Sequence, residues 1–165
     1  FYDGRGSRLF DAICDTPEYY LTRVDTELLR QHADELVALV RPTDVIELGA
    51  GGARKTRLLL DALMRAGGDV RYVPMDVSES HLLQTAEALR REYPALRVHG
   101  IAGDYERHLE RIPPGERRLV LFLGSTIGNL TPTQATAFVS RLARCLAPGD
   151  AILIGMDLVK PAGLL

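Results

Sequence analysis

The chain has 165 residues, of which 20 are basic and 22 are acidic, and 46% of its residues are apolar. This is the composition of an ordinary globular domain, and the length is sufficient for one compact domain with a substantial core. The near-neutral charge argues against electrostatic binding of nucleic acid, and no apolar run approaches the ~20 residues that span a membrane.

The cysteines and histidines exclude two further classes of site. Cys14 and Cys145 are too few for a disulfide framework, which predicts a reducing, cytoplasmic setting. No signal-like segment opens the chain. The four histidines fall at no metal-ligand spacing and no CxxC accompanies them, so we expect no metal site.

The first 42 residues are expected to form an N-terminal helical cap. From about residue 22 to residue 40, apolar side chains recur at helical spacing. Arg41-Pro42 should end this helix, because the residue before a proline is pushed out of the α region.

Residues 43–165 alternate strand and helix, with short breaks of glycine and proline. Apolar segments predict strands at 45–48, 70–77, 96–102, 119–123 and 151–156. The helices expected between them cover 55–66, 78–93 with Ser78 as its cap, 105–111, and 131–146 with a Thr131–Gln134 capping box. This order predicts an α/β fold in which helices flank a doubly wound, mostly parallel sheet.

The first strand ends in a glycine turn, Glu47-Leu48-Gly49-Ala50-Gly51-Gly52, where such sheets bind ligands. A P-loop would match Lys55-Thr56, but Arg54 stands where that motif needs glycine. A dinucleotide fingerprint would match Gly49 and Gly51 and fails at the same arginine. Both alternatives are therefore disfavoured.

The third alternative is a methyltransferase that uses S-adenosylmethionine (SAM), which has no phosphate. Asp76 ends the second expected strand, where a carboxylate can accept hydrogen bonds from a ribose diol. Asp104 and Tyr105 follow the third expected strand, where the aspartate can accept a hydrogen bond from an adenine amino group and the tyrosine can pack on the adenine ring. Either aspartate could instead cap the next helix. Matches at three consecutive strand ends favour the Rossmann-like class I methyltransferase fold.

Longer motifs resemble one family, the histidine-specific Nα-methyltransferases of ergothioneine biosynthesis. The resemblance covers essentially the whole chain, and its most specific block follows the fourth strand. Its motifs are Phe1-Tyr2-Asp3-Gly4-Arg5-Gly6-Ser7, Leu9-Phe10-Asp11, Pro17-Glu18-Tyr19-Tyr20 with Thr22-Arg23, Glu47-Leu48-Gly49 with Lys55-Thr56-Arg57, residues 122–132 (FLGSTIGNLTP) and residues 155–160 (GMDLVK).

The resemblance implies a role for eight residues. The expected SAM contacts are Gly49, Lys55, Asp76, Asp104 and Tyr105. Asn129 and Tyr19 would hold the amino and carboxylate end of L-histidine as catalytic and substrate-binding residues, and Tyr2 would lie near the imidazole.

Each of these residues also has a structural alternative. Lys55 could be a solvated lysine, although a cation at a helix N-terminus is locally unfavourable, which favours a ligand carboxylate as its partner. Tyr2 and Tyr19 could be packing aromatics, and Asn129 could serve only the turn before a helix. Ser125 as a hydrolase nucleophile is disfavoured, because no histidine accompanies it in the sequence pattern.

The implied reaction is in-line methyl transfer from the sulfonium of SAM to the α-amine of histidine, in three rounds, giving the trimethylated betaine hercynine. Positioning and desolvation would be the main contributions of the protein, because the sulfonium is already an activated donor. The amine must be neutral to attack, and its burial disfavours the charged form. We therefore expect no dedicated strong base.

Two other functions remain open at this point. The acceptor could be another amino acid, such as an indole-bearing one, or the chain could be a non-catalytic SAM-binding module. We also expect the C-terminal part of the fold to be missing, because such sheets usually have further strands after the fifth. An unpaired edge strand would then favour dimerisation of this chain.

Overall fold

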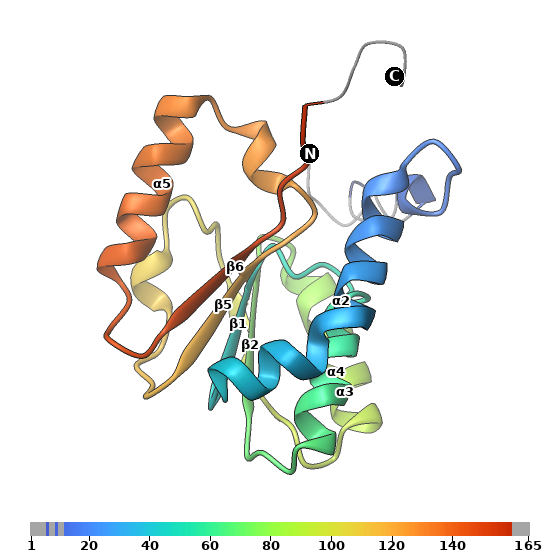
Figure 1. Ribbon diagram of the computed structural model, residues 1–165, viewed down its shortest axis with the longest axis vertical. Coiled ribbons are helices and arrows are strands. Elements are labelled where there is room, and N and C mark those ends of the chain that lie inside the picture. Colours follow the sequence, from blue (N-terminus) through green and yellow to red (C-terminus); the bar gives the residue numbers. More distant parts are fainter. Residues whose placement is uncertain (1–5, 7–8, 10–11, 160–165) are drawn as a thin grey trace.

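The computed structural model describes residues 6, 9 and 12–159, which fold into a twisted sheet with helices on both faces (Figure 1). Among these residues the strand order is β3-β2-β1-β5-β6, with β4 beside β2, and every paired strand is parallel. The strands are β1 (Asp44–Leu48), β2 (Arg71–Asp76), β3 (Arg97–Val98), β4 (Ile101–Ala102), β5 (Arg118–Phe122) and β6 (Ala151–Ile154).

Three helices lie on one face of the sheet and one on the other (Figure 1). The first group comprises α2 (Tyr20–Val40), α3 (Thr56–Arg65) and α4 (Glu79–Glu92), and α5 (Pro132–Arg144) lies opposite. Two short 3-10 helices, η1 (Leu109–Arg111) and η2 (Thr126–Asn129), complete the described elements. None of the helices in this part of the chain is long and apolar enough to cross a bilayer.

Alternate residues of the central strands supply two cores. Along β5, Leu119 and Leu121 belong to the core beneath α2, α3 and α4, whereas Val120 and Phe122 belong to the core beneath α5. All five residues of β5 are buried, as its nearly continuous apolar sequence predicts. The predicted doubly wound parallel sheet is thus confirmed for the described residues.

The third predicted strand, residues 96–102, differs from the prediction. It forms two short strands, β3 and β4, which pair with β2 in one continuous register on either side of a gap. Pro74 of β2 lies opposite that gap, and a proline has no N–H to donate to a ladder. The interruption therefore follows from the sequence of β2 rather than from that of the third strand.

The ends of the helices follow local backbone chemistry. Helix α2 ends at Val40, and Arg41 adopts the left-handed conformation before Pro42, at the predicted break. The Thr131–Gln134 capping box at the start of α5 is confirmed. Ser78 occupies the N-cap of α4, but contrary to the prediction its side chain makes no capping hydrogen bond. The predicted helix at 105–111 is reduced to the single turn of η1.

Candidate cofactor and substrate site

The glycine turn after β1 lies at the carboxyl end of the sheet, between β2 and β5. Gly49 and Gly51 have φ angles of 74° and 49°, a conformation that side chains rarely adopt. The turn borders a small cavity of about 110 Å³. The cavity is lined by Cys14, Tyr19, Thr22, Glu47, Gly49, Ala50, Gly51, Gly52, Ala53, Arg54, Lys55, Leu123, Gly124 and Thr126.

Asp76, at the end of β2, fastens this turn to the neighbouring strand. Its Oδ2 accepts a hydrogen bond from the Gly51 N–H at 2.9 Å, and its Oδ1 accepts one from the Ser78 N–H at 2.9 Å. The second bond forms a local turn before α4, but the N-cap of that helix is Ser78, so Asp76 is not the helix cap of the structural alternative. Each carboxylate oxygen has a further acceptor site, so hydroxyl groups of a ligand could still be bound.

Asp104 and Tyr105 follow β4, at the same end of the sheet as the glycine turn. Oδ1 of Asp104 accepts a hydrogen bond from the Glu106 N–H at 2.8 Å. The Tyr105 ring packs edge-on against Phe122, with ring centroids 5.2 Å apart. A Cβ built on Gly49 would lie 3.6 Å from Cε1 of Tyr105, so the tyrosine and the turn are in van der Waals range. The structure thus brings Gly49, Asp76 and Tyr105 together.

Lys55 is not a solvated lysine. Its side chain is only 16% exposed, and its Nζ donates to Oδ2 of Asp25 on α2 at 2.7 Å. The expected partner was a ligand carboxylate, but the structure supplies a carboxylate from the protein itself. Sequence reasoning did not find Asp25, although an acidic residue beside the apolar stripe of Leu28 and Leu29 is a detectable signal.

The expected substrate residues are less closely gathered. Tyr19 precedes α2 and lines the 110 Å³ cavity together with Lys55. Asn129 ends η2 and is exposed; it does not line that cavity. Tyr2 lies outside the described residues.

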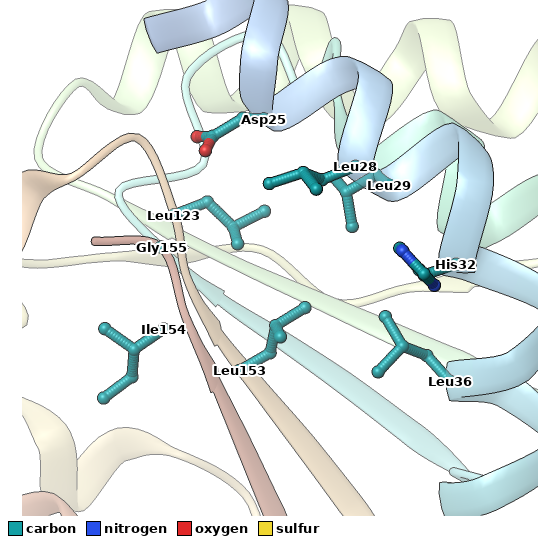
Figure 2. A pocket seen from close by; sticks show the side chains of 9 residues that line it. All are labelled: Asp25, Leu28, Leu29, His32, Leu36, Leu123, Leu153, Ile154 and Gly155. Carbon is teal, nitrogen blue, oxygen red and sulfur yellow. The ribbon is translucent and has the colours of Figure 1, made fainter. Parts of the chain in front are cut away.

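A second hollow, of about 300 Å³, separates α2 from the outer strand β6 (Figure 2). It is mostly apolar, and Leu28, Leu29, Leu36 and Leu153 line it. Figure 2 shows the Asp25 carboxylate at one end, pointing toward the chain near Leu123 and Gly155. This hollow lacks the glycine turn and Asp76, so it is not the place for a nucleoside.

A buried carboxyl group beneath the turn also escaped the sequence analysis. Glu47 of β1 accepts hydrogen bonds from the Thr56 hydroxyl, at 2.6 Å, and from the Tyr72 hydroxyl. Burial raises the pKa of Glu47 from its ordinary value, although both hydrogen bonds and the charge of Lys55 act in the opposite direction. Its position within the motif residues 47–49 was the available signal.

These residues fit SAM as a cofactor. The left-handed glycine turn leaves the backbone accessible, Asp76 offers acceptors for a ribose, and Lys55 offers a positive charge for a carboxylate. The cavity of about 110 Å³ is smaller than typical ligand sites, which measure about 300–1,000 Å³. It can therefore hold only part of a SAM molecule. Asp76, Asp104 and Tyr105 do not line this cavity, and Gly49, which does, is exposed.

Comparison with known families decides the class. A model of the SAM-dependent, histidine-specific methyltransferases matches residues 1–165. The chain belongs to this family. The resemblance found in its motifs is therefore confirmed, and the cofactor of the family is the one that the glycine turn and Asp76 fit.

Individual relatives agree with this assignment. The histidine N-alpha-methyltransferase of Mycobacterium tuberculosis (strain CDC 1551 / Oshkosh) is 50% identical over 165 residues, which are 100% of this chain and 51% of the relative. Ergothioneine biosynthesis protein 1 of Schizosaccharomyces pombe (strain 972 / ATCC 24843) is 38% identical, over 94% of this chain and 22% of the relative. The chain thus spans about half or less of the length of these curated relatives.

A solved structure supports the fold alone. The plantazolicin methyltransferase BpumL, determined in complex with S-adenosylhomocysteine (SAH), superposes with a TM-score of 0.52. The match covers 85% of this chain and 49% of BpumL, at 14% sequence identity. The class I methyltransferase fold predicted from the strand order is consequently confirmed.

Proposed function

We propose that the protein of which this chain forms part is a SAM-dependent histidine Nα-methyltransferase. Its product would be hercynine, the trimethylated betaine of histidine, made for ergothioneine biosynthesis. The observation that carries the proposal is the contact of Asp76 with the glycine turn, in a chain that matches the histidine-specific family from end to end. The names of the relatives from Mycobacterium tuberculosis and Schizosaccharomyces pombe support the acceptor and the pathway.

We assign the cofactor to the edge of the sheet at β1, β2 and β4. Gly49, Asp76, Asp104 and Tyr105 would hold the nucleoside, and Lys55 the carboxylate of the amino-acid part. SAM supplies a methyl group activated by a sulfonium. The residues named here would bind and orient the cofactor.

Asn129 and Tyr19 would hold the amino and carboxylate end of histidine, with Tyr2 near the imidazole. Their task would be to aim the lone pair of the α-nitrogen at the methyl group. Because burial disfavours an ammonium, the site would favour the neutral amine that can attack. The N–C bond would form as the S–CH₃ bond breaks, the electron pair would leave with sulfur, and the proton released by nitrogen would pass to solvent.

We also propose that residues 1–42 are a helical cap of the substrate region and that residues 43–165 belong to the SAM-binding core. Support for the cap comes from Tyr19 and Asp25, which both reach the cofactor side from the N-terminal segment. A cytoplasmic location remains part of the proposal, and Cys14 and Cys145 are both free thiols.

The test is a product assay with the full-length protein, SAM and single amino acids. We expect histidine to gain up to three methyl groups by mass spectrometry, and L-tryptophan to gain none. Methylation of tryptophan alone would transfer the assignment to an indole acceptor. Binding of SAH without turnover of any amino acid would identify a non-catalytic SAM-binding module.

Two variants test the site itself. Asp76→Asn should weaken SAH binding, measured by calorimetry, by about tenfold or more, because a charge-assisted hydrogen bond contributes about 1.5–3 kcal/mol. Asp69→Asn is the matched control, since Asp69 forms only an exposed ion pair with Arg97. Asn129→Ala should lower kcat/KM for histidine and leave SAH affinity unchanged. The exposed Thr133→Ala nearby is its control.

A further inference from the structure

Asp25 joins three parts of the molecule that are distant in sequence. From α2, its Oδ2 accepts hydrogen bonds from Nζ of Lys55, at 2.7 Å, and from the Gly124 N–H, at 2.9 Å. A Cβ built on Gly155 would lie 3.6 Å from the same oxygen. One carboxylate thus connects the start of α3 with the chain that follows β5 and β6.

The Asp25–Lys55 pair is shielded, unlike the other link between α2 and α3. The side chains of Asp25 and Lys55 are 18% and 16% exposed. Asp34 and Arg65 join the same two helices at 2.7 Å, but their side chains are 76% and 60% exposed. Exposed ion pairs such as Asp34–Arg65 contribute little to stability. The shielded Asp25–Lys55 pair instead holds its two charges in a defined place.

We propose that Asp25 is a positioning residue for cofactor binding. It holds the Lys55 ammonium at the cavity beside the glycine turn, ready for the carboxylate of the amino-acid part of SAM. This inference rests on the proposed function, and it assigns to Asp25 an action through Lys55 rather than a contact with the reacting atoms.

The chemistry of lysine makes such a residue necessary. A lysine side chain is long and flexible, and fixing it on binding costs conformational entropy. Asp25 fixes it beforehand and takes up one of its three N–H donors, which leaves the others for a ligand. With the ligand bound, the ammonium would offset the repulsion between Asp25 and the proposed carboxylate.

Gly124 leaves room beside the Lys55 ammonium. It has a φ of 76°, and a Cβ built there would lie 3.4 Å from Nζ of Lys55. Because glycine has no Cβ, this side of the ammonium stays open while Asp25 holds it. Because the Gly124 N–H also binds Asp25, the same contact fixes the beginning of the segment that leads to η2 and Asn129.

The experiment compares two ligands on the purified full-length protein by calorimetric titration. SAH carries the amino-acid carboxylate, and 5′-methylthioadenosine has the same nucleoside and thioether without it. We expect Asp25→Asn to weaken SAH binding about tenfold and to change methylthioadenosine binding less than about twofold. Asp34→Asn, the matched control on the same helix, should change neither affinity.

A double variant tests whether Asp25 acts through Lys55. Lys55→Met should show the same selective loss of SAH affinity, and adding Asp25→Asn to it should cause little further loss, because the two residues form one unit. If Asp25→Asn does not fold, Asp25→Glu replaces it. This variant keeps the charge but displaces it by one methylene, and should also weaken SAH selectively.

Four results would overturn the inference. Equal weakening of both ligands would indicate a structural role for Asp25, and unchanged SAH affinity in the folded Asp25 variants would indicate none. Fully additive losses in the double variant would show that Asp25 does not act through Lys55. A wild-type protein that binds neither ligand would refute the proposed function itself, and with it this inference.

Discussion

Glu47 lies in the middle of the sheet beneath the glycine turn, where burial disfavours the charged form of its carboxyl group. It is 5% exposed, and two hydroxyl groups, those of Thr56 and Tyr72, donate to it. Burial is the largest influence on its pKa and raises it. Burial and the neighbouring carboxylate likewise raise the pKa of the Tyr72 hydroxyl well above its ordinary value, so tyrosine remains the donor.

This raised pKa predicts a pH dependence of stability. A carboxyl group whose pKa is higher in the folded than in the unfolded state binds protons more tightly when folded. The contribution of this group to the unfolding free energy is complete at pH values below the pKa of the unfolded state. It is lost as the pH rises through the pKa of the folded state, by about 1.4 kcal/mol for each pH unit between the two pKa values. Glu47→Gln has no such titration. The stability advantage of the wild-type protein over Glu47→Gln should therefore shrink as the pH rises.

The measurement is the unfolding free energy of both proteins in urea, at about pH 5 and about pH 8. Glu87→Gln, at an exposed position of α4, is the control, and its difference from wild type should not depend on pH. A wild-type advantage over Glu47→Gln that stays constant or grows with pH would contradict the predicted direction.

At the scale of the elements, the start of α5 gives a second prediction. The Thr131 hydroxyl accepts from the Gln134 N–H at 3.3 Å, and the Gln134 side chain accepts from the Thr131 N–H at 2.9 Å. Thr131→Ala removes the first bond and should lower the unfolding free energy by about 1 kcal/mol. Urea unfolding measures this loss.

Thr136→Ala, one turn further along α5, is the matched control. The Thr136 hydroxyl donates to the Pro132 carbonyl within the helix and satisfies no free N–H group. Its replacement should leave stability unchanged or slightly higher, because alanine has the higher helix propensity. Equal losses in the two variants would mean that the capping bonds do not stabilise α5.

Local sequence was sufficient to predict most of these elements. β1 and β5 each contain apolar residues in a short run and are buried along their whole length, and α5 begins at a capping box whose two partners are three residues apart. Such signals are contained within one segment. The sheet and most helix boundaries could therefore be predicted before any tertiary contact was known.

The features that sequence reasoning missed depend on contacts between distant segments. The break between β3 and β4 lies opposite Pro74 of another strand, and the role of Asp25 depends on Lys55, thirty residues further along the chain. The turn of η2 follows Ser125, whose φ of 56° is unusual for a residue other than glycine. In the site, the glycine turn and Asp76 were predictable from strand ends; the anchoring of Lys55 was not.

At the scale of the whole molecule, helices cover both faces of the sheet, and β6 forms one of its two edges. β1 and β5 are fully buried, whereas every residue of β6 is only half-buried. Among the described residues β6 pairs with β5 alone, so its outer side offers free backbone groups. An open edge of this kind is a template for pairing with another strand.

We therefore expect the 165-residue chain, produced alone, to associate through β6 in a concentration-dependent way, as sedimentation velocity would show. The Gly155 N–H donates to the Phe122 carbonyl, and N–H groups alternate along a strand, so the Ile154 N–H faces outward. Ile154→Pro removes that donor and should shift the chain toward monomer. Ile154→Ala loses similar packing but keeps the N–H, and should still associate. A wild-type chain that remains monomeric, or equal behaviour of the two variants, would show that the backbone edge does not drive association.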